Sequence, residues 1–247
     1  MFRDYDVNST RFMQTKPTLV FACAHLTDER LFGHQVDALR ATHECRVFAF
    51  RDHPTLGGMA DELLAHAPAR FTLIGLSLGG YLAFEVIRRQ RERIERLVLL
   101  DTRASADTET QRQGRLADIA KVPAGGIDAL IPELPVRWMH AAHRARLSDL
   151  MASMARSIGN HGQFNQQQAM LGRPDSHADL RTVRVPTLVA CGREDPVTPV
   201  AEHERMRDCV LGARLEVFEQ CGHLTTIEQP EVVTSLLTRW LADTRPA

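Results

Sequence analysis

Hydrophobic residues fall into six short runs rich in Val, Leu, Ile and Phe, separated by segments of mixed polarity. The runs lie at 18–23, 46–50, 71–75, 96–101, 187–191 and 214–218. Near-continuous hydrophobicity over such a short length is typical of strands that are buried on both faces of a sheet. We therefore expect a mostly parallel sheet built from these runs.

The segments between the runs repeat their apolar residues at helical spacing. The clearest examples are 30–41, 57–67, 79–91, 200–210 and 230–242. Regular alternation of strand and helix predicts an α/β fold with a doubly wound sheet, in which helices cover both faces.

The alternation is interrupted once, in a long interval between Asp101 and Pro186 that contains no convincing strand. Its helical pattern is broken at prolines and glycines, namely Pro123, Gly125, Gly126, Pro132, Pro135 and Gly159. We expect three or four helices here, forming a cap over one edge of the sheet. The predicted division is a core of 1–102 and 184–247 with a cap of 103–183. The alternative is that these helices only extend the flank of the sheet.

The composition narrows the class of partner. The chain has 247 residues, 44% hydrophobic and 25% charged, which are ordinary values for a globular domain. With 30 basic and 31 acidic residues, the net charge of -1 offers no general attraction for nucleic acid or an anionic membrane. We expect a small-molecule substrate, no nucleic-acid or membrane partner, and a monomer or homodimer.

Cysteine usage and short motifs exclude several other kinds of site. The five cysteines are irregularly spaced and contain no C-x-x-C pair, which favours free thiols and a cytoplasmic location. The N-terminal segment lacks the apolar core of a signal peptide, and no apolar run approaches the roughly 18 residues of a membrane span. No H-E-x-x-H, G-x-x-x-x-G-K-[ST] or G-x-G-x-x-G motif occurs, so we expect neither a metal nor a cofactor.

Residues 75–79 read Gly-Leu-Ser-Leu-Gly, between a predicted strand and a predicted helix. A G-x-S-x-G motif in this context predicts that Ser77 is a nucleophile held in a sharp turn. The flanking glycines allow strand and helix to approach closely, and the start of the helix directs amide donors toward developing negative charge. The alternative is a serine that stands in a glycine-rich turn by chance.

A serine nucleophile needs a histidine as its base. Eleven histidines are available. His223 follows the last predicted strand and precedes the final helix, which places it at the same carboxyl edge of the sheet as Ser77. His25 and His53 also fall near that edge, and the sequence favours His223.

The base in turn needs a carboxylate that orients it. Asp195 follows the run at 187–191, in a loop stiffened by Pro196 and Pro199. Asp101, at the end of the run at 96–101, is the alternative, because a carboxylate there also emerges at the carboxyl edge. Asp195 could instead cap a helix and Asp101 could form a turn.

With Ser77, Asp195 and His223 in this order, each after a predicted strand, the sequence resembles the α/β-hydrolase family from about residue 16 to residue 241. GREDPVTP around the acid, CGH at the base and LLDT before the insertion add to the resemblance. It implies a catalytic triad of these three residues. It also implies a helical cap inserted after the sixth core strand of the family, which corresponds to the run at 96–101.

The chain departs from the family after its first strand. Most members carry His-Gly there, where this chain has Cys23-Ala24. The resemblance then assigns the two oxyanion-binding amides to His25 and Leu78, since only the amide has to point correctly. We expect the His25 side chain to contact substrate. The further candidates for substrate binding are Leu26, Trp138 and Met139.

The resemblance implies a hydrolase that cleaves a small carboxylic ester, thioester or lactone through an acyl-enzyme on Ser77. Hydrolysis of a C–C bond, or lyase chemistry with the triad as a base, is the alternative. A non-catalytic small-molecule receptor is the third. An arginine pair in the pocket would favour an anionic substrate, and the candidates are Arg103, Arg137, Arg144 and Arg146.

Overall fold

The computed structural model describes residues 16–245. Residues 1–15 lie outside the described residues. They include the start of the predicted core and most of the N-terminal segment that lacks the apolar pattern of a signal peptide. Six strands form one parallel sheet in the order β2-β1-β3-β4-β5-β6. They are β1 (Thr18–Ala22), β2 (Glu44–Phe48), β3 (Phe71–Leu76), β4 (Ile94–Leu100), β5 (Thr187–Gly192) and β6 (Arg214–Phe218). This confirms the predicted fold class.

The strand predicted at 46–50 begins and ends two residues earlier than expected. Glu44 and Cys45 pair in register with Thr18 and Leu19 of β1, so the parallel ladder extends to them. β2 lies at the edge of the sheet and is partly exposed, which weakens its hydrophobic pattern.

Helices outside the insertion occur at each predicted position, and the short η2 and α9 are present in addition. They are η1 (Glu29–Phe32), α1 (Gly33–Leu39), α2 (Leu56–His66), α3 (Leu78–Gln90), η2 (Arg91–Arg93), α8 (Val200–Cys209), α9 (Thr225–Glu228) and α10 (Pro230–Asp243). The predicted helix at 30–41 is divided into η1 and α1.

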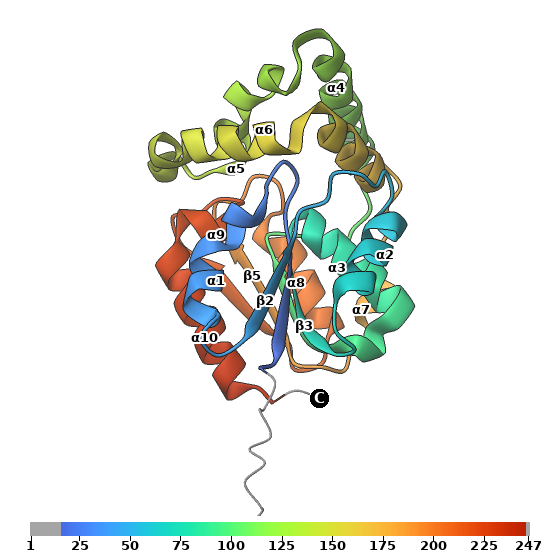
Figure 1. Ribbon diagram of the computed structural model, residues 1–247, viewed down its shortest axis with the longest axis vertical. Helices are drawn as coiled ribbons and strands as arrows, with labels where there is room; N and C mark the ends of the chain where they lie inside the picture. The colour runs from blue at the N-terminus through green and yellow to red at the C-terminus, as the bar shows by residue number, and fades with distance from the viewer. Residues whose placement is uncertain (1–15, 246–247) are drawn as a thin grey trace, which may run out of the picture.

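The two faces of the sheet contact different sets of helices, because successive side chains of a strand point to opposite faces. Leu19 and Phe21 pack in the core that also contains residues of α1 and α10. Val20 and Ala22 pack in a second core with residues of α2, α3 and α8. Figure 1 shows α1 and α10 on one side of the sheet and α2 and α3 on the other. The sheet is therefore covered on both faces.

The interval between β4 and β5 is helical. It contains α4 (Glu109–Gly125), η3 (Ile127–Ala129), η4 (Ile131–Glu133), α5 (Leu134–Trp138), α6 (Ala141–Leu171) and α7 (His177–Leu180). α4, α5 and α6 lie at one end of the molecule, beyond the sheet (Figure 1). The insertion follows β4, which is the fourth strand when strands are counted from β1 at Thr18. The family's count, used in the sequence analysis, makes the same strand the sixth.

Of the predicted helix breaks, the one at Gly159 is confirmed and the one at Pro123 is not. α4 continues through Pro123 and ends at Gly125, before Gly126 adopts a φ of 65°. α6 is interrupted at Gly159, where φ is 70°, so it consists of two helices joined at a kink.

No helix within residues 16–245 is both long enough and apolar enough to cross a membrane.

Candidate active site

Ser77 lies in the turn between β3 and α3 with a φ of 54°, a conformation that is rare for a residue with a side chain. The turn depends on its glycines. A Cβ atom on Gly79 would lie 2.0 Å from the carbonyl oxygen of Ala22, and one on Gly75 would lie 2.3 Å from the carbonyl oxygen of Gly79. The close approach of α3 to β1 and β3 holds Ser77 at the carboxyl edge of the sheet.

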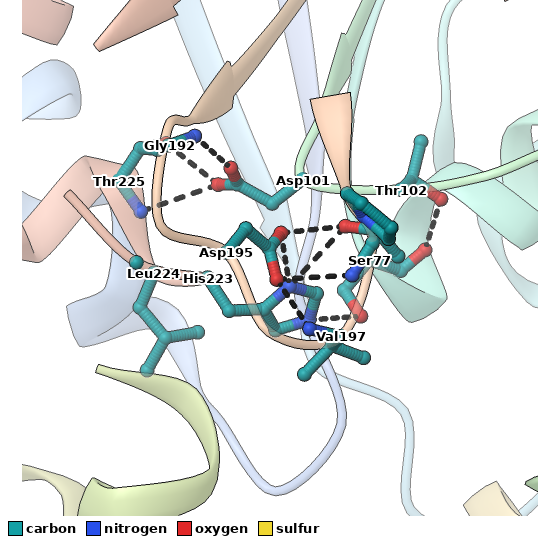
Figure 2. Close-up of polar contacts among 12 residues, drawn as sticks. Ser77, Asp101, Thr102, Gly192, Asp195, Val197, His223, Leu224 and Thr225 are labelled. Carbon is teal, nitrogen blue, oxygen red and sulfur yellow. Dashed lines mark hydrogen bonds and ion pairs between the residues drawn. The ribbon is translucent and has the colours of Figure 1, made fainter. Parts of the chain in front are cut away.

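The structure brings Ser77, His223 and Asp195 into one hydrogen-bonded chain, drawn in Figure 2. His223 Nε2 lies 2.9 Å from Ser77 Oγ, and His223 Nδ1 lies 2.8 Å from Asp195 Oδ2. A carboxylate only accepts hydrogen bonds, so Nδ1 carries the proton and Nε2 is free to accept from the serine hydroxyl. All three residues are buried.

Asp195 is held by its own loop. Its Oδ1 accepts hydrogen bonds from the amides of Val197 and Thr198, at 2.7 and 3.0 Å, and its Oδ2 accepts from the Thr198 hydroxyl at 2.6 Å. Burial by itself would raise the pKa of Asp195, but the neighbouring His223 and these hydrogen bonds lower it overall. The carboxylate is therefore ionised and fixed in direction beside the imidazole.

A family model described as "Alpha/beta hydrolase family" matches residues 24–236. The chain belongs to this family. The match covers the strand ends that carry Ser77, Asp195 and His223. The protein is thus a hydrolase.

Named relatives fall into more than one class of hydrolase. 3-Oxoadipate enol-lactonase 1 of Acinetobacter baylyi is 26% identical over 233 residues, which are 88% of this chain and 86% of the relative. A 2-hydroxymuconate semialdehyde hydrolase of a Pseudomonas species is 28% identical over 184 residues, 69% of this chain and 62% of the relative. Among solved structures, a thermophilic esterase from Thermogutta terrifontis has a TM-score of 0.84 at 27% identity, covering 92% of this chain and 90% of that one.

Asp101, the alternative acid of the hydrolase, lies close to the triad but binds other groups. Its Oδ1 accepts from the Gly192 amide at 3.2 Å, and its Oδ2 accepts from the amide and hydroxyl of Thr225, at 3.2 and 2.7 Å. Burial and the neighbouring Asp195 raise the pKa of Asp101. Asp101 therefore connects the loops that carry Asp195 and His223 (Figure 2).

The segment after β1 forms a turn without the glycine that is usual in the family. Thr27 donates from its amide and its hydroxyl to the carbonyl of Ala24, and the positive φ of the turn falls on Leu26. Within residues 16–245, neither the amide of His25 nor that of Leu78 has a described protein acceptor outside the regular helices and strands.

A small cavity of about 50 Å³ adjoins Ser77 and His223. Its wall also includes Ala24, His25, Tyr81, Arg115, Trp138, Met170, Val197 and Leu224. Of the predicted substrate contacts, His25 and Trp138 lie in this wall. A larger apolar groove near the amino ends of β3, β4 and β5 contains none of the triad residues.

The predictions for Leu26 and Met139 are not supported by their positions. Both side chains are buried in the hydrophobic core and do not belong to the cavity wall. Leu26 instead donates its amide to Gln166 of α6, and the carbonyl of Met139 accepts from Arg144.

The arginine in the cavity wall is Arg115 of α4, which was not among the predicted candidates. Arg137 pairs with Asp118 and Glu133, while Arg144 and Arg146 donate to backbone carbonyls. Arg103 pairs with Asp107. The polar sequence around Arg115 contains several charged residues, and its spacing does not reveal which of them faces the core.

Proposed function

We propose that this hydrolase cleaves a small carboxylic ester, thioester or lactone through an acyl-enzyme on Ser77. The observation that carries the proposal is the chain of hydrogen bonds from Ser77 through His223 to Asp195. The names of the enol-lactonase and esterase relatives are in keeping with an ester substrate.

In this mechanism Ser77 Oγ attacks the carbonyl carbon and transfers its proton to His223 Nε2. Asp195 stabilises the resulting imidazolium and keeps Nε2 directed at the serine. The tetrahedral intermediate then collapses, and His223 returns the proton to the departing alcohol or thiol. Water attacks the acyl-enzyme in the second half of the reaction, with His223 again as the base.

The amides of His25 and Leu78 would bind the oxyanion of each tetrahedral intermediate. They come from the turn after β1 and from the first residue of α3, and His25 shares the cavity wall with Ser77. Loss of one such donor typically costs about 3 kcal/mol of transition-state stabilisation.

The first test is Ser77→Ala with p-nitrophenyl acetate or butyrate as substrate. Turnover should fall by about three orders of magnitude or more, since members of a triad act as a unit. Ser235→Ala, at an exposed position of α10, is the matched control and should retain wild-type turnover. Hydrolysis at the wild-type rate by folded Ser77→Ala protein would exclude Ser77 as the nucleophile.

Labelling separates catalysis from simple binding. A fluorophosphonate should modify wild-type protein at Ser77 and leave Ser77→Ala unmodified, because only an activated serine reacts. A protein that binds small molecules without labelling or turnover would instead be a non-catalytic receptor.

Hydrolysis of a C–C bond is the second candidate, and its support is the similarity to a 2-hydroxymuconate semialdehyde hydrolase. The same triad could then act as a base. To distinguish C–C hydrolysis from ester hydrolysis, the protein is incubated with 2-hydroxymuconate semialdehyde and the absorbance of this compound is monitored. Consumption of the compound without turnover of esters favours the second candidate.

Three further features belong to the proposal. Residues 103–183 would act as a cap, since the cavity wall includes Arg115, Trp138 and Met170 from the insertion. A cytoplasmic location is supported by the five free cysteines, of which Cys23, Cys191 and Cys221 are buried. A monomer or homodimer remains the expected assembly, and light scattering of the purified protein would test it.

A further inference from the structure

Three arginines share a single carboxylate beside the active-site cavity. Asp107 Oδ1 lies 2.7 Å from Arg103 and 2.6 Å from Arg173, and Asp107 Oδ2 lies 2.7 Å from Arg115 Nε. We call these four residues the Asp107 cluster. At least 84% of each side chain is buried, with Arg115 the most exposed at 16%.

The Asp107 cluster is not electrically balanced. Three guanidinium groups face one carboxylate, which leaves two positive charges without an ionic partner inside the cluster. Arg173 gains some compensation from the ring of Tyr81, 4.2 Å from its guanidinium carbon. A buried excess of positive charge is costly, and binding of an anion would reduce that cost.

Arg115 is the member of the cluster that reaches the cavity. Asp107 occupies its Nε and one terminal nitrogen. The other terminal nitrogen lies 3.3 Å from the Gln167 side-chain oxygen and 3.0 Å from the Met170 sulfur. A thioether is a weak acceptor, so this nitrogen keeps capacity for a stronger one. Met170 also lines the cavity, which puts this edge of the guanidinium at the cavity wall.

His25 supplies an unsatisfied polar group in the same wall. Its Nε2 is buried and has no hydrogen-bond partner among the residues that the structure describes. Burial, together with the positive charges of Arg115 and Arg137, lowers the pKa of His25 to about 3, so the ring is neutral at ordinary pH. It can therefore form a hydrogen bond with a ligand without adding charge.

We propose that Arg115 binds a carboxylate of the substrate, so that the ester, thioester or lactone cleaved at Ser77 also carries a free carboxylate. The choice of Ser77 as the reacting group rests on the proposed function, whereas the carboxylate subsite rests on the Asp107 cluster. Because the cavity is small, the carboxylate lies only a few bonds from the scissile carbonyl. The guanidinium suits this ligand, since one edge can stay on Asp107 while the other terminal nitrogen donates a charge-assisted hydrogen bond to the substrate carboxylate in place of the Met170 sulfur.

The kinetic test compares two methyl esters of equal acyl length, methyl butyrate and monomethyl succinate, by the methanol released. Arg115→Gln should lower the ratio of kcat/KM for monomethyl succinate to that for methyl butyrate by about 10- to 100-fold, the usual effect of losing a charged hydrogen-bond partner. Damage to the fold would lower both values and leave the ratio unchanged. Asp107 retains Arg103 and Arg173 in this variant, so the cluster keeps its ion pairs.

Arg112→Gln is the matched control, since Arg112 is exposed one turn earlier on α4. It should keep the wild-type ratio. An equal ratio in wild type, Arg112→Gln and Arg115→Gln would overturn the carboxylate subsite.

A binding measurement tests the subsite independently of catalysis. Succinate is titrated by calorimetry into the Ser77→Ala variant and into the double variant that also carries Arg115→Gln. The affinity of the double variant should be at least 10-fold lower. Equal affinities, or no binding in either variant, would overturn the proposal. Succinate binding that depends on Arg115, in a protein that neither hydrolyses esters nor reacts with a fluorophosphonate, would support the subsite and contradict the proposed function.

Discussion

At the scale of single residues, the site depends on glycine, because the absence of a Cβ atom lets backbone segments approach closely. Ser77 adopts a positive φ, and Gly79 brings the start of α3 against the end of β1. Any side chain at Gly79 would overlap the carbonyl of Ala22. Because the amide of the preceding residue, Leu78, is a proposed oxyanion donor, a shift at Gly79 would affect both folding and chemistry.

Gly79→Ala should therefore lower the free energy of unfolding by about 2–4 kcal/mol, as expected for overpacking against backbone atoms that cannot move aside. Gly114→Ala is the matched control, because Gly114 lies within α4 and a Cβ there meets nothing within 4 Å. That variant should be as stable as wild type or gain up to about 1 kcal/mol. Urea unfolding checks both, and equal stability of the two variants would contradict the packing argument.

At the scale of elements, the Asp107 cluster connects segments that are distant in the sequence. Arg103 follows β4, Arg115 lies on α4 and Arg173 follows α6, and all three bind Asp107. Burial opposes ionisation of Asp107, but Arg115 and Arg173 hold its pKa below the usual range. The cluster thus links the base of the insertion to two of its helices.

Asp107→Asn should lower the free energy of unfolding at pH 7 by about 3 kcal/mol, because three buried cations lose their only carboxylate within the cluster. Since the folded pKa of Asp107 is lowered, its contribution is present above the ordinary pKa of an aspartate and is lost as the pH falls through the folded value. The stability difference between wild type and Asp107→Asn should therefore shrink on acidification. Denaturant unfolding at several pH values measures this.

Asp128→Asn provides the control, since the Asp128–Arg156 pair is more than half exposed. An exposed pair contributes less than about 1 kcal/mol, so this variant should remain close to wild type at every pH. If the two aspartate variants lost the same stability, the Asp107 cluster would have no special structural role.

At the scale of the whole molecule, burial keeps two histidines neutral. The pKa of His203 is lowered to about 4, chiefly by burial, and His203 Nε2 accepts a hydrogen bond from the Thr102 amide. The pKa of His25 is lowered to about 3 by burial and by nearby positive charge. In the unfolded chain both rings bind a proton near pH 6.5.

The unfolded state therefore binds more protons between about pH 6.5 and pH 4, and stability should decrease as the pH falls through this range. The slope is at most about 1.4 kcal/mol per pH unit for each histidine. His203→Gln should flatten the slope by up to that amount, while His34→Gln, at an exposed position of α1, should keep the wild-type slope. An unchanged slope in His203→Gln would show that His203 is not a source of the pH dependence.

Much of the fold and part of the site could be predicted from the sequence because their signals are local. The apolar runs indicated the strands, and the glycines around Ser77 indicated a tight turn. Their positions after strands predict Asp195 and His223 as partners of Ser77, and the structure places these two side chains within hydrogen-bond distance of one another. Side chains in the cavity wall are harder to predict, since Leu26 after β1 and Met139 of the insertion lie in the core, while Arg115 reaches the cavity from a polar stretch without a distinctive pattern.

The sequence by itself determined the alternation of strand and helix, the turn at Ser77 and the order of the three polar residues at the carboxyl edge. These follow from hydrophobic period and glycine placement, which act over a few residues. Only the tertiary structure decided which arginine faces the cavity, that Asp101 supports the loops of Asp195 and His223, and that three arginines share Asp107. Such contacts join segments far apart in the chain, so they depend on how the helices of the insertion pack, which no local pattern specifies.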